Sequence, residues 1–427
     1  MSIVEISQFV TNFLIAGFKI FRFWWWFILP LIFYFLARYL YAFWVRYFFW
    51  YRQFVWTIFE IKPPKEILKP FKAMEDIFSV LWGTIDIPNW REKWCEGELP
   101  FGGGLWFSFE IASFGGDIHF YLRIPELFEN AAKAAIYSQY PDAEIQKTDD
   151  YTQKVPQDVP NKEWDMYGED FSFIKPDCYP IKTYEEFFEP SGERITKEEK
   201  RLDPMDSLLE HLSKIQSGEQ IWCQFICIPI TNDLVPFIDE AKAIIAKIAR
   251  REKTLSIGVT EEGEREMLLT PGERRILTAI EKKISKPAYQ TTIRTVHIYK
   301  RKGPYVGGNY KILSAYLNHF ATVDMNAIRR WKATRTRIHY FFRQARLFTR
   351  KKAIFKWYIE RTPSYWPRSP QAKPIFQAVR GGGKGTVILN TEELASLFHF
   401  PTKIIVPTAP RVEAKKGGPP SSLPIEE

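Results

Sequence analysis

A glycine-rich run near the carboxyl end is the first stretch whose residue types could do chemistry. Residues 381–386 read GGGKGT. A phosphate loop needs GxxxxGK followed directly by Ser or Thr, because backbone amides cradle the phosphates, the lysine reaches them and the hydroxyl holds the metal. Here Gly385 follows Lys384, and no apolar strand leads into the run. We therefore expect a turn before a short strand at Val387–Leu389, without a nucleotide site.

Cysteine and histidine side chains are the next candidates, as metal ligands or nucleophiles. Cys223 and Cys227 are four residues apart in a strand-like run, with no second cysteine pair and no histidine nearby. A zinc site would need a second pair of ligands, so buried thiols acting as small apolar groups are the better interpretation. The six histidines are scattered, and no HExxH, GxSxG or paired-carboxylate pattern stands out. The sequence predicts no catalytic group, metal or cofactor; an unrecognised enzyme site within residues 149–200 is the alternative.

The densest group of charges lies between Arg329 and Arg361. Twelve Lys or Arg and one acid give this segment +11, against +9 for the whole chain, so the remaining residues carry −2. Aromatic residues are interleaved with the charges. One interpretation is a contact with nucleic acid or anionic lipid. The other is an amphipathic helix with its aromatic residues toward the core. Under the first, the contact residues are Arg329, Arg330, Lys332, Arg335, Arg337, Arg343, Arg346, Arg350, Lys351, Lys352 and Lys356.

The N-terminal region is predicted to be a membrane anchor, with a transmembrane helix at about residues 21–44. Residues 23–37 are all uncharged, and Arg38 carries the one charge between residues 23 and 44. At 1.5 Å per residue this run spans about 30 Å of hydrocarbon. A signal peptide would be followed by a small-residue cleavage site, and a core helix rarely holds three consecutive Trp. Aromatic residues at both ends are the expected interface anchors: Trp24, Trp25, Trp26, Tyr39, Tyr41 and Trp44.

The charges that flank the anchor set its expected orientation. More Lys and Arg follow the apolar run than precede it, so a single-pass protein of the cytoplasmic (inner) membrane is expected, with its body in the cytoplasm. Four cysteines without evident pairing agree with a reducing compartment. Residues 44–59 remain aromatic and are expected to continue as a juxtamembrane helix that Pro63 and Pro64 end.

The rest of the chain predicts an α+β body. Apolar residues make up 46% of the sequence, which is enough for a packed core. Runs of period two at 105–112 and 118–124, joined by Gly115 and Gly116, predict a β-hairpin. Further strands are expected at 143–148, 221–228 and 289–300. Helices are expected after Pro125, at 204–212 and 235–248, after a capping box at Thr270 and Glu273, and after an Asn309 cap.

Strands alternate with helices but are partly hairpin-linked, which favours ferredoxin-like (split βαβ) α/β sandwich modules over a large parallel sheet. The expected organisation is an anchor and juxtamembrane helix at 1–62, a first module at 76–230 with a long insertion at 149–200, a second module at 220–325, a basic helical segment with a closing strand and helix at 326–401, and a Pro/Gly-rich linker or tail at 402–427.

Several stretches carry a resemblance to one family. They include FEIASFGGDIHFYLR at 109–123, IYSQYPDAE at 136–144 and LNTEELASLFHFP at 389–401, together with residues 203–224 and 269–284. They resemble the membrane-anchored N-terminal region, a domain of unknown function, of type IV secretion or conjugative coupling-type ATPases of candidate-phylum bacteria. In that family a Pro-rich segment leads into a motor domain with a phosphate loop, which this sequence lacks up to Glu427.

The resemblance implies a non-enzymatic, membrane-anchored scaffold of a DNA translocation apparatus. Its expected partners are a separately encoded ATPase and further copies of itself, unless the chain is the front half of a split ATPase. The alternative is a stand-alone membrane-associated protein that binds nucleic acid through residues 329–361. Salt dependence of binding would separate the two, because phosphate contacts weaken steeply as salt rises.

Overall fold

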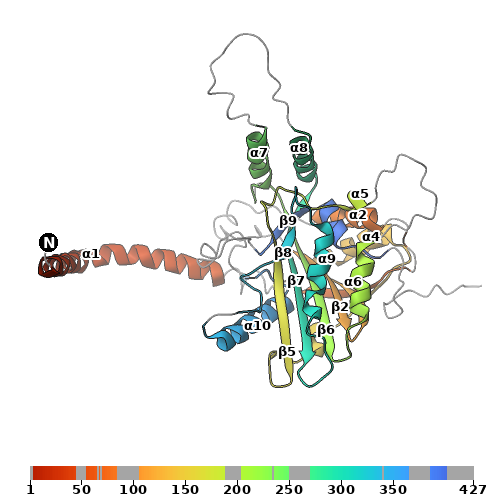
Figure 1. The fold of residues 1–427 in the computed structure, drawn as a ribbon, viewed down its shortest axis with the longest axis horizontal. Coiled ribbons are helices and arrows are strands. Elements are labelled where there is room, and N and C mark those ends of the chain that lie inside the picture. Colours follow the sequence, from red (N-terminus) through yellow and green to blue (C-terminus); the bar gives the residue numbers. More distant parts are fainter. Residues whose placement is uncertain are drawn as a thin grey trace, which may run out of the picture.

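The computed structural model describes residues 3–44, 54–64, 67, 70–83, 105–187, 203–232, 235–249, 270–338, 341–364 and 385–401. These residues form a mixed α+β structure around one nine-stranded sheet (Figure 1). Every strand pair in the sheet is antiparallel. The expected α+β class is therefore confirmed, and the two expected modules share a single sheet.

The first half of the sheet is one β-α-β-β-α-β unit. Its elements are β1 (Trp56–Lys62), α2 (Pro70–Trp82), β2 (Phe107–Phe114), β3 (Asp117–Pro125), α4 (Glu129–Gln139) and β4 (Glu144–Lys147). The strands lie in the order β4-β1-β3-β2. This element order is that of a split βαβ unit. The expected hairpin is confirmed as β2 and β3, and its turn needs Gly115 and Gly116, which both have positive φ.

The second half repeats the same plan. Its elements are β5 (Trp164–Phe173), α6 (Pro204–Ser213), β6 (Glu219–Ile230), β7 (Ala288–Lys300), α9 (Ile312–Leu317) and β8 (Ile328–Arg330). The strands lie in the order β8-β5-β7-β6, the counterpart of β4-β1-β3-β2. Two helices are inserted between β6 and β7: α7 (Phe237–Ile248) and α8 (Pro271–Ile284), which project beyond the end of the sheet (Figure 1).

The two units join through β2 and β6, which are the corresponding edge strands of each. These strands pair antiparallel from Phe107 opposite Cys227 to Phe114 opposite Gln220. An antiparallel pairing of equivalent strands relates the units by an approximate two-fold axis normal to the sheet. Strand β9 (Val387–Asn390) pairs with β7 and leads into α11 (Thr391–Leu397). The shorter elements are η2 (Glu126–Phe128), η3 (Tyr151–Lys154), α5 (Tyr184–Phe187), η4 (Asn309–Lys311) and η5 (Asn318–Phe320).

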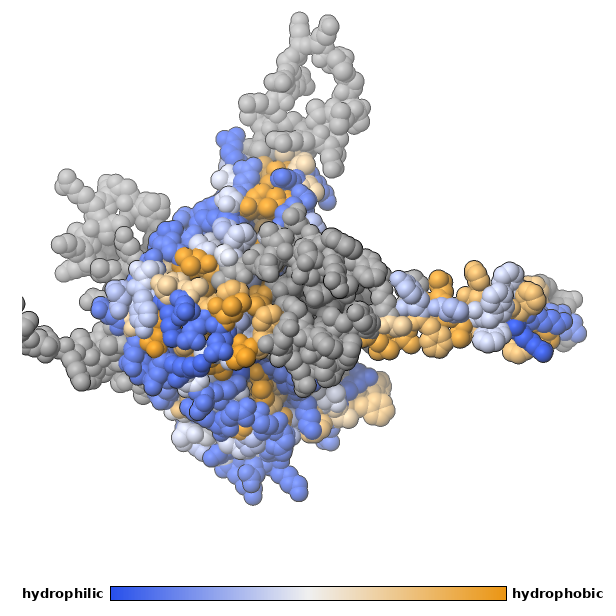
Figure 2. Space-filling model, turned by 180° about the vertical axis from the view of Figure 1, so that it is seen from behind, coloured by the Kyte–Doolittle hydropathy of each residue, from blue (hydrophilic) through white to orange (hydrophobic). Residues whose placement is uncertain are grey.

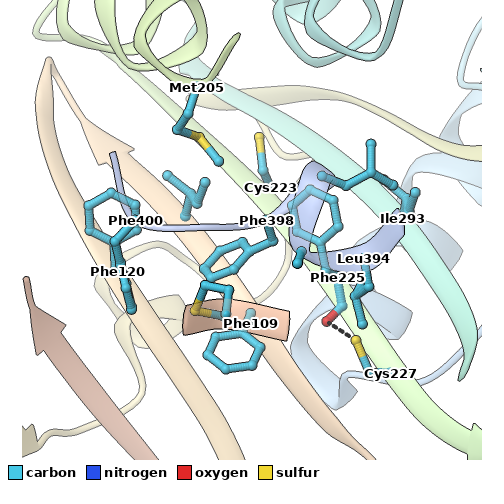
Figure 3. Packing of buried hydrophobic residues seen from close by; sticks show 14 of the residues in the cluster. Phe109, Phe120, Met205, Cys223, Phe225, Cys227, Ile293, Leu394, Phe398 and Phe400 are labelled. Atoms are coloured by element: carbon cyan, nitrogen blue, oxygen red, sulfur yellow. Dashed lines mark hydrogen bonds between the residues drawn. The ribbon is translucent and has the colours of Figure 1, made fainter. Parts of the chain in front are cut away.

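One face of the sheet is apolar and carries the main core. Helices α2, α4, α6, α9 and α11 contribute to this core, which includes both units. Phe109 of β2, Phe225 of β6 and Phe398 after α11 meet at its centre, with ring centroids of Phe109 and Phe398 4.8 Å apart (Figure 3). Alternate residues of each strand supply this face, so the core spans the junction between the units.

The opposite face carries a smaller core under α10 (Arg343–Glu360). Trp222 of β6 and Met166 of β5 pack there with Phe355 and Tyr358 of α10. The helix leaves the body on the same flank as α1 (Figure 1). Gly385, before β9, is required by close packing, because a Cβ atom there would lie 2.3 Å from the Trp331 ring, and its φ is positive.

The N-terminal helix α1 (Ile3–Trp44) projects from the body as a separate arm (Figure 1). It is 42 residues long and contains Pro30. Figure 2 shows apolar surface along much of this arm. In the part of the chain that the structure describes, no helix combines the length and apolar character that a membrane crossing requires.

Several sequence expectations need correction. Residues 56–62 of the expected juxtamembrane helix are strand β1, so the first unit begins before residue 76. The expected insertion at 149–200 contains β5, which is a strand of the sheet and the start of the second unit. Asn309 does not cap a helix with its side chain; it begins η4 and donates to Glu219 at 2.7 Å. The tail at 402–427 lies outside the described residues.

Candidate functional site

A row of polar side chains crosses the sheet on the face that α10 covers. Glu110 of β2 lies opposite Gln224 of β6, which lies opposite Arg294 of β7, which lies opposite Asp170 of β5. All four are fully buried. Directly opposed residues of antiparallel strands point to the same face, so the strand register alone brings these groups into one line.

Arg294 fastens the segment that follows α10 to the sheet. Its Nε donates to Asp170 Oδ1 at 2.6 Å, in a pair that is fully buried on both sides. Its Nη1 donates to the carbonyl of Thr362 at 3.0 Å, and its Nη2 donates to Ser364 Oγ at 2.9 Å. A planar guanidinium with several donors can hold a carboxylate and a backbone carbonyl together.

Arg361, directly after α10, attaches the carboxyl end of that helix to Glu110 and Asp150. Its Nε donates to Glu110 Oε1 at 3.1 Å and its Nη2 donates to Asp150 Oδ1 at 2.8 Å. Its own carbonyl accepts from the Trp106 indole at 2.8 Å. Burial opposes the charge on Arg361, but Glu110 and Asp150 outweigh it and raise the pKa of the guanidinium above its usual value. Arg361 is therefore charged at every physiological pH.

Glu110 is the common acceptor of this network. Ser108 Oγ donates to it at 2.7 Å and Gln224 Nε2 at 2.9 Å. The Tyr151 hydroxyl donates to its other oxygen at 2.7 Å and lies 2.7 Å from the Tyr358 hydroxyl. Burial raises the pKa of both tyrosines well above its usual value, so they stay protonated. Phenols held in this state donate hydrogen bonds and do not act as bases, which makes the network a fastening for α10.

The basic side chains of residues 329–361 form two sets, one that contacts the body and one that is exposed. Arg350 Nη1 donates to the carbonyl of Arg335 at 2.7 Å, and Lys351 Nζ donates to Asp165 Oδ1 at 2.6 Å. Arg335 Nε donates to the Tyr167 hydroxyl at 3.1 Å. The exposed members of the predicted contact set are Arg329, Lys332, Arg337, Arg343, Arg346, Lys352 and Lys356; Arg330, Arg335, Arg350 and Lys351 are half-buried.

The amphipathic-helix interpretation of the basic segment holds for part of it. The amphipathic helix is observed in the second half of α10, where Ile354, Phe355 and Tyr358 are buried. In the first half, Phe348 is exposed beside Lys352, whose Nζ lies 4.6 Å from the ring centroid. The binding interpretation applies to that first half and remains a prediction.

Glu169 of β5 is a fully buried carboxyl beside the basic segment. Burial raises its pKa to about 7. The Tyr167 hydroxyl donates to Oε2 at 2.7 Å, and Arg335 Nε lies 3.9 Å away. Its Oε1 finds no hydrogen-bond donor among the described residues. A proton on this carboxyl near neutral pH relieves the cost of burying its charge.

The other candidates from the sequence are the cysteine pair and the glycine-rich run. Cys223 and Cys227 point into the apolar core (Figure 3), and burial raises the pKa of the Cys223 thiol to about 12. Within the described ranges, no three His, Cys, Asp or Glu side chains are grouped to hold a metal ion. Residues 381–384 lie outside the described residues, and Thr386 is buried where it accepts from Gln290 at 3.2 Å.

The aromatic residues predicted to anchor α1 lie within that helix. Trp24, Trp25 and Trp26 are exposed. The side chains of Tyr39, Tyr41 and Trp44 lie outside what the structure describes. That these residues contact lipid remains a prediction.

Sequence reasoning missed the buried polar row, although a signal for it exists. Glu110 is the one charged residue of 107–114, and Gln224 and Arg294 each stand alone in a run of apolar or β-branched residues, 221–230 and 291–296. A single charged residue in a strand that is apolar on both faces must find a buried partner. Matching such interruptions across strands would have found the row.

One protein family matches the middle part of this chain. Residues 104–306 match the model of a family described as a domain of unknown function (DUF8128). The matched region runs from just before β2 past the end of β7, and so contains Glu110, Gln224, Arg294 and Asp170. A search of curated proteins finds no match.

Proposed function

We propose that this protein is a non-enzymatic scaffold, held at a membrane by the aromatic helix α1. The observation that carries the proposal is the exposure of large apolar side chains on a helix that leaves the body. Phe23 is 70% exposed and Phe27 is 65% exposed. A helix in water covers its apolar side chains against a core, whereas a lipid surface accepts Trp and Phe at its interface.

The body supports a structural role in this proposal. Its most strongly hydrogen-bonded polar groups, around Glu110 and Arg361, are buried and saturated by one another, so they hold a helix in place. The resemblance of five stretches to the anchored region of type IV secretion or conjugative ATPases supports a translocation motor as the partner. That choice of partner rests on the resemblance alone, because the matched family is of unknown function.

Membrane fractionation tests the lipid contact. The full chain and a variant with Trp24, Trp25 and Trp26 changed to Ser are expressed in the same bacterial host. The wild-type chain is expected in the membrane pellet, and the variant is expected to shift to the supernatant, because interfacial Trp residues stabilise α1 in lipid. Retention after alkaline carbonate and a protease-protected N-terminus would distinguish a spanning helix from an interfacial one. A wild-type chain that stays in the supernatant contradicts the proposal.

Co-purification tests the scaffold role. In mild detergent, the chain is expected to have the mass of an oligomer by light scattering, or to bring with it an ATPase that contains a phosphate loop. A monomer without partners contradicts the scaffold role and leaves nucleic-acid binding as the alternative.

A further inference from the structure

The first turn of α10 lies beyond the sheet that holds the rest of the helix. Arg343 and Ile354 are eleven residues apart, which is three turns of helix, so both are on the same side of α10. Ile354 is fully buried and Arg343 is exposed. The sheet therefore ends between them, and residues 343–346, which are all exposed, project from the body.

Two phenylalanines form the tip of this projection. Phe341 is 85% exposed and Phe342 is 81% exposed. Phe342 also has a left-handed backbone, with φ of 57°, where bulky residues are rare. No core covers these two rings, because both are more than four fifths exposed, so they are available to another molecule.

Basic side chains surround the aromatic tip. Arg343 and Arg346 are exposed on the projecting first turn of α10. Lys352 is exposed farther along the helix, with its ammonium beside the Phe348 ring. The helix segment from Arg343 to Lys352 contains no Asp or Glu. The tip thus combines exposed apolar rings with exposed positive charge.

We propose that the tip of α10, residues 341–346, inserts into an anionic lipid leaflet. Phe341 and Phe342 would lie below the headgroups, and Arg343 and Arg346 would contact lipid phosphates. The charge favours an anionic surface, and the side chains match an interfacial helix with aromatic and basic residues. Figure 1 shows α10 and α1 leaving the same flank of the body, which favours lipid over nucleic acid as the occupant. The inference rests on the proposed membrane location, and the buried network around Arg361 sets the direction of α10.

Vesicle co-sedimentation of the full chain tests this inference separately from the role of α1. Binding is compared on phosphatidylcholine vesicles and on vesicles that also contain phosphatidylglycerol. The gain from phosphatidylglycerol is assigned to α10, whereas binding to neutral vesicles is assigned to α1. Each basic residue near an anionic leaflet strengthens binding roughly fivefold, so Arg343→Gln with Arg346→Gln is expected to reduce the gain about 30-fold. Phe341→Ser with Phe342→Ser is expected to reduce it at least tenfold, and the control Lys356→Gln, farther along α10, is expected to retain it.

The outcomes separate the two proposals. Loss of the phosphatidylglycerol gain in both double variants, with neutral binding intact, supports the inference. A gain that survives either double variant overturns it and leaves the role of α1 standing. Loss of neutral binding only in the Trp24–Trp26 variant supports the role of α1. Binding of an oligothymidine or duplex DNA that both double variants abolish, without a phosphatidylglycerol gain in the wild type, overturns the lipid inference in favour of nucleic acid.

Discussion

Replacing Arg361 by Met should remove the main fastening of α10 and destabilise the body strongly. Met retains most of the aliphatic volume, so the change isolates the loss of charge and hydrogen bonds. Glu110 is fully buried, whereas the Asp150 side chain is 26% exposed and can be hydrated when the guanidinium is gone. The loss is therefore concentrated at Glu110. Removing one partner of a buried ion pair costs about 3–5 kcal/mol.

Part of that cost should be recovered by neutralising the stranded carboxylate. In the double variant Arg361→Met with Glu110→Gln, the amide can still bond Ser108 and Tyr151, and no unpaired charge is buried. We expect the double variant to be about 2 kcal/mol more stable than Arg361→Met alone. The matched control is Lys356→Met on the exposed side of the same helix, which should change stability by less than about 0.5 kcal/mol.

Urea unfolding of the full chain, followed by tryptophan fluorescence, measures these differences. Trp106 and Trp222 are buried beside the network, so their emission reports its loss. The midpoint should fall in Arg361→Met and partly recover in the double variant, with an unchanged slope against urea. A midpoint for Arg361→Met equal to that of Lys356→Met would refute the reasoning. So would a double variant less stable than the single one.

Three further predictions concern other parts of the body. The pKa of Glu169 is about 7 in the folded chain and 4.5 in the unfolded chain. The proton that it binds therefore stabilises the fold fully below about pH 4.5, and about 3 kcal/mol of this stabilisation is lost as the pH rises to 7. Glu169→Gln should remove this slope from urea midpoints measured between pH 5 and 8; an identical slope in the variant contradicts the assignment. Lys283 and Glu393 form a fully buried pair at 3.0 Å, so Lys283→Met should cost about 3–5 kcal/mol in the same assay, and a loss under about 1 kcal/mol would mean that the pair is not held. Phe109→Ala should cost about 3–5 kcal/mol through a cavity at the junction of the units, whereas Leu127→Ala, at a residue 75% exposed, should be nearly neutral; equal thermal midpoints would contradict this core assignment.

Elements with local signals could be predicted from the sequence. The β2–β3 hairpin was predictable because its turn requires glycine and its strands alternate. The capping box of Thr270 and Glu273 is formed by the predicted side chains and begins α8. The strand at β6 was predicted as central because it is apolar on both faces, and it lies between β2 and β7.

Elements whose pattern depends on distant partners could not be predicted. Strand β5 reads WDMYGEDFSF, and its acidic residues look like a surface segment until Asp170 is matched with Arg294, more than a hundred residues away. The +11 segment likewise appears uniform in sequence, although Arg361 and Lys351 face buried or half-buried carboxylates while Arg343 faces outward. Charge counts cannot separate these groups, because the difference lies in which carboxylates the sheet brings beside them.

The repeated plan of the two units explains where the distinctive features of this protein lie. The shared elements, β-α-β-β-α-β in each unit, serve the common core, and their equivalent strands β2 and β6 join them. Several helices lie outside the repeat: α1 precedes the first unit, α5, α7 and α8 interrupt the second, and α10 and α11 follow it. Two of these helices expose large aromatic residues, and α10 is fixed by a polar row that runs across the junction of both units. The polar row therefore fixes the direction of α10 on the sheet, as the proposed lipid contact of its amino end requires. The buried attachment through Arg361 fixes one end of α10, and the exposed Phe341 and Phe342 lie at its other end.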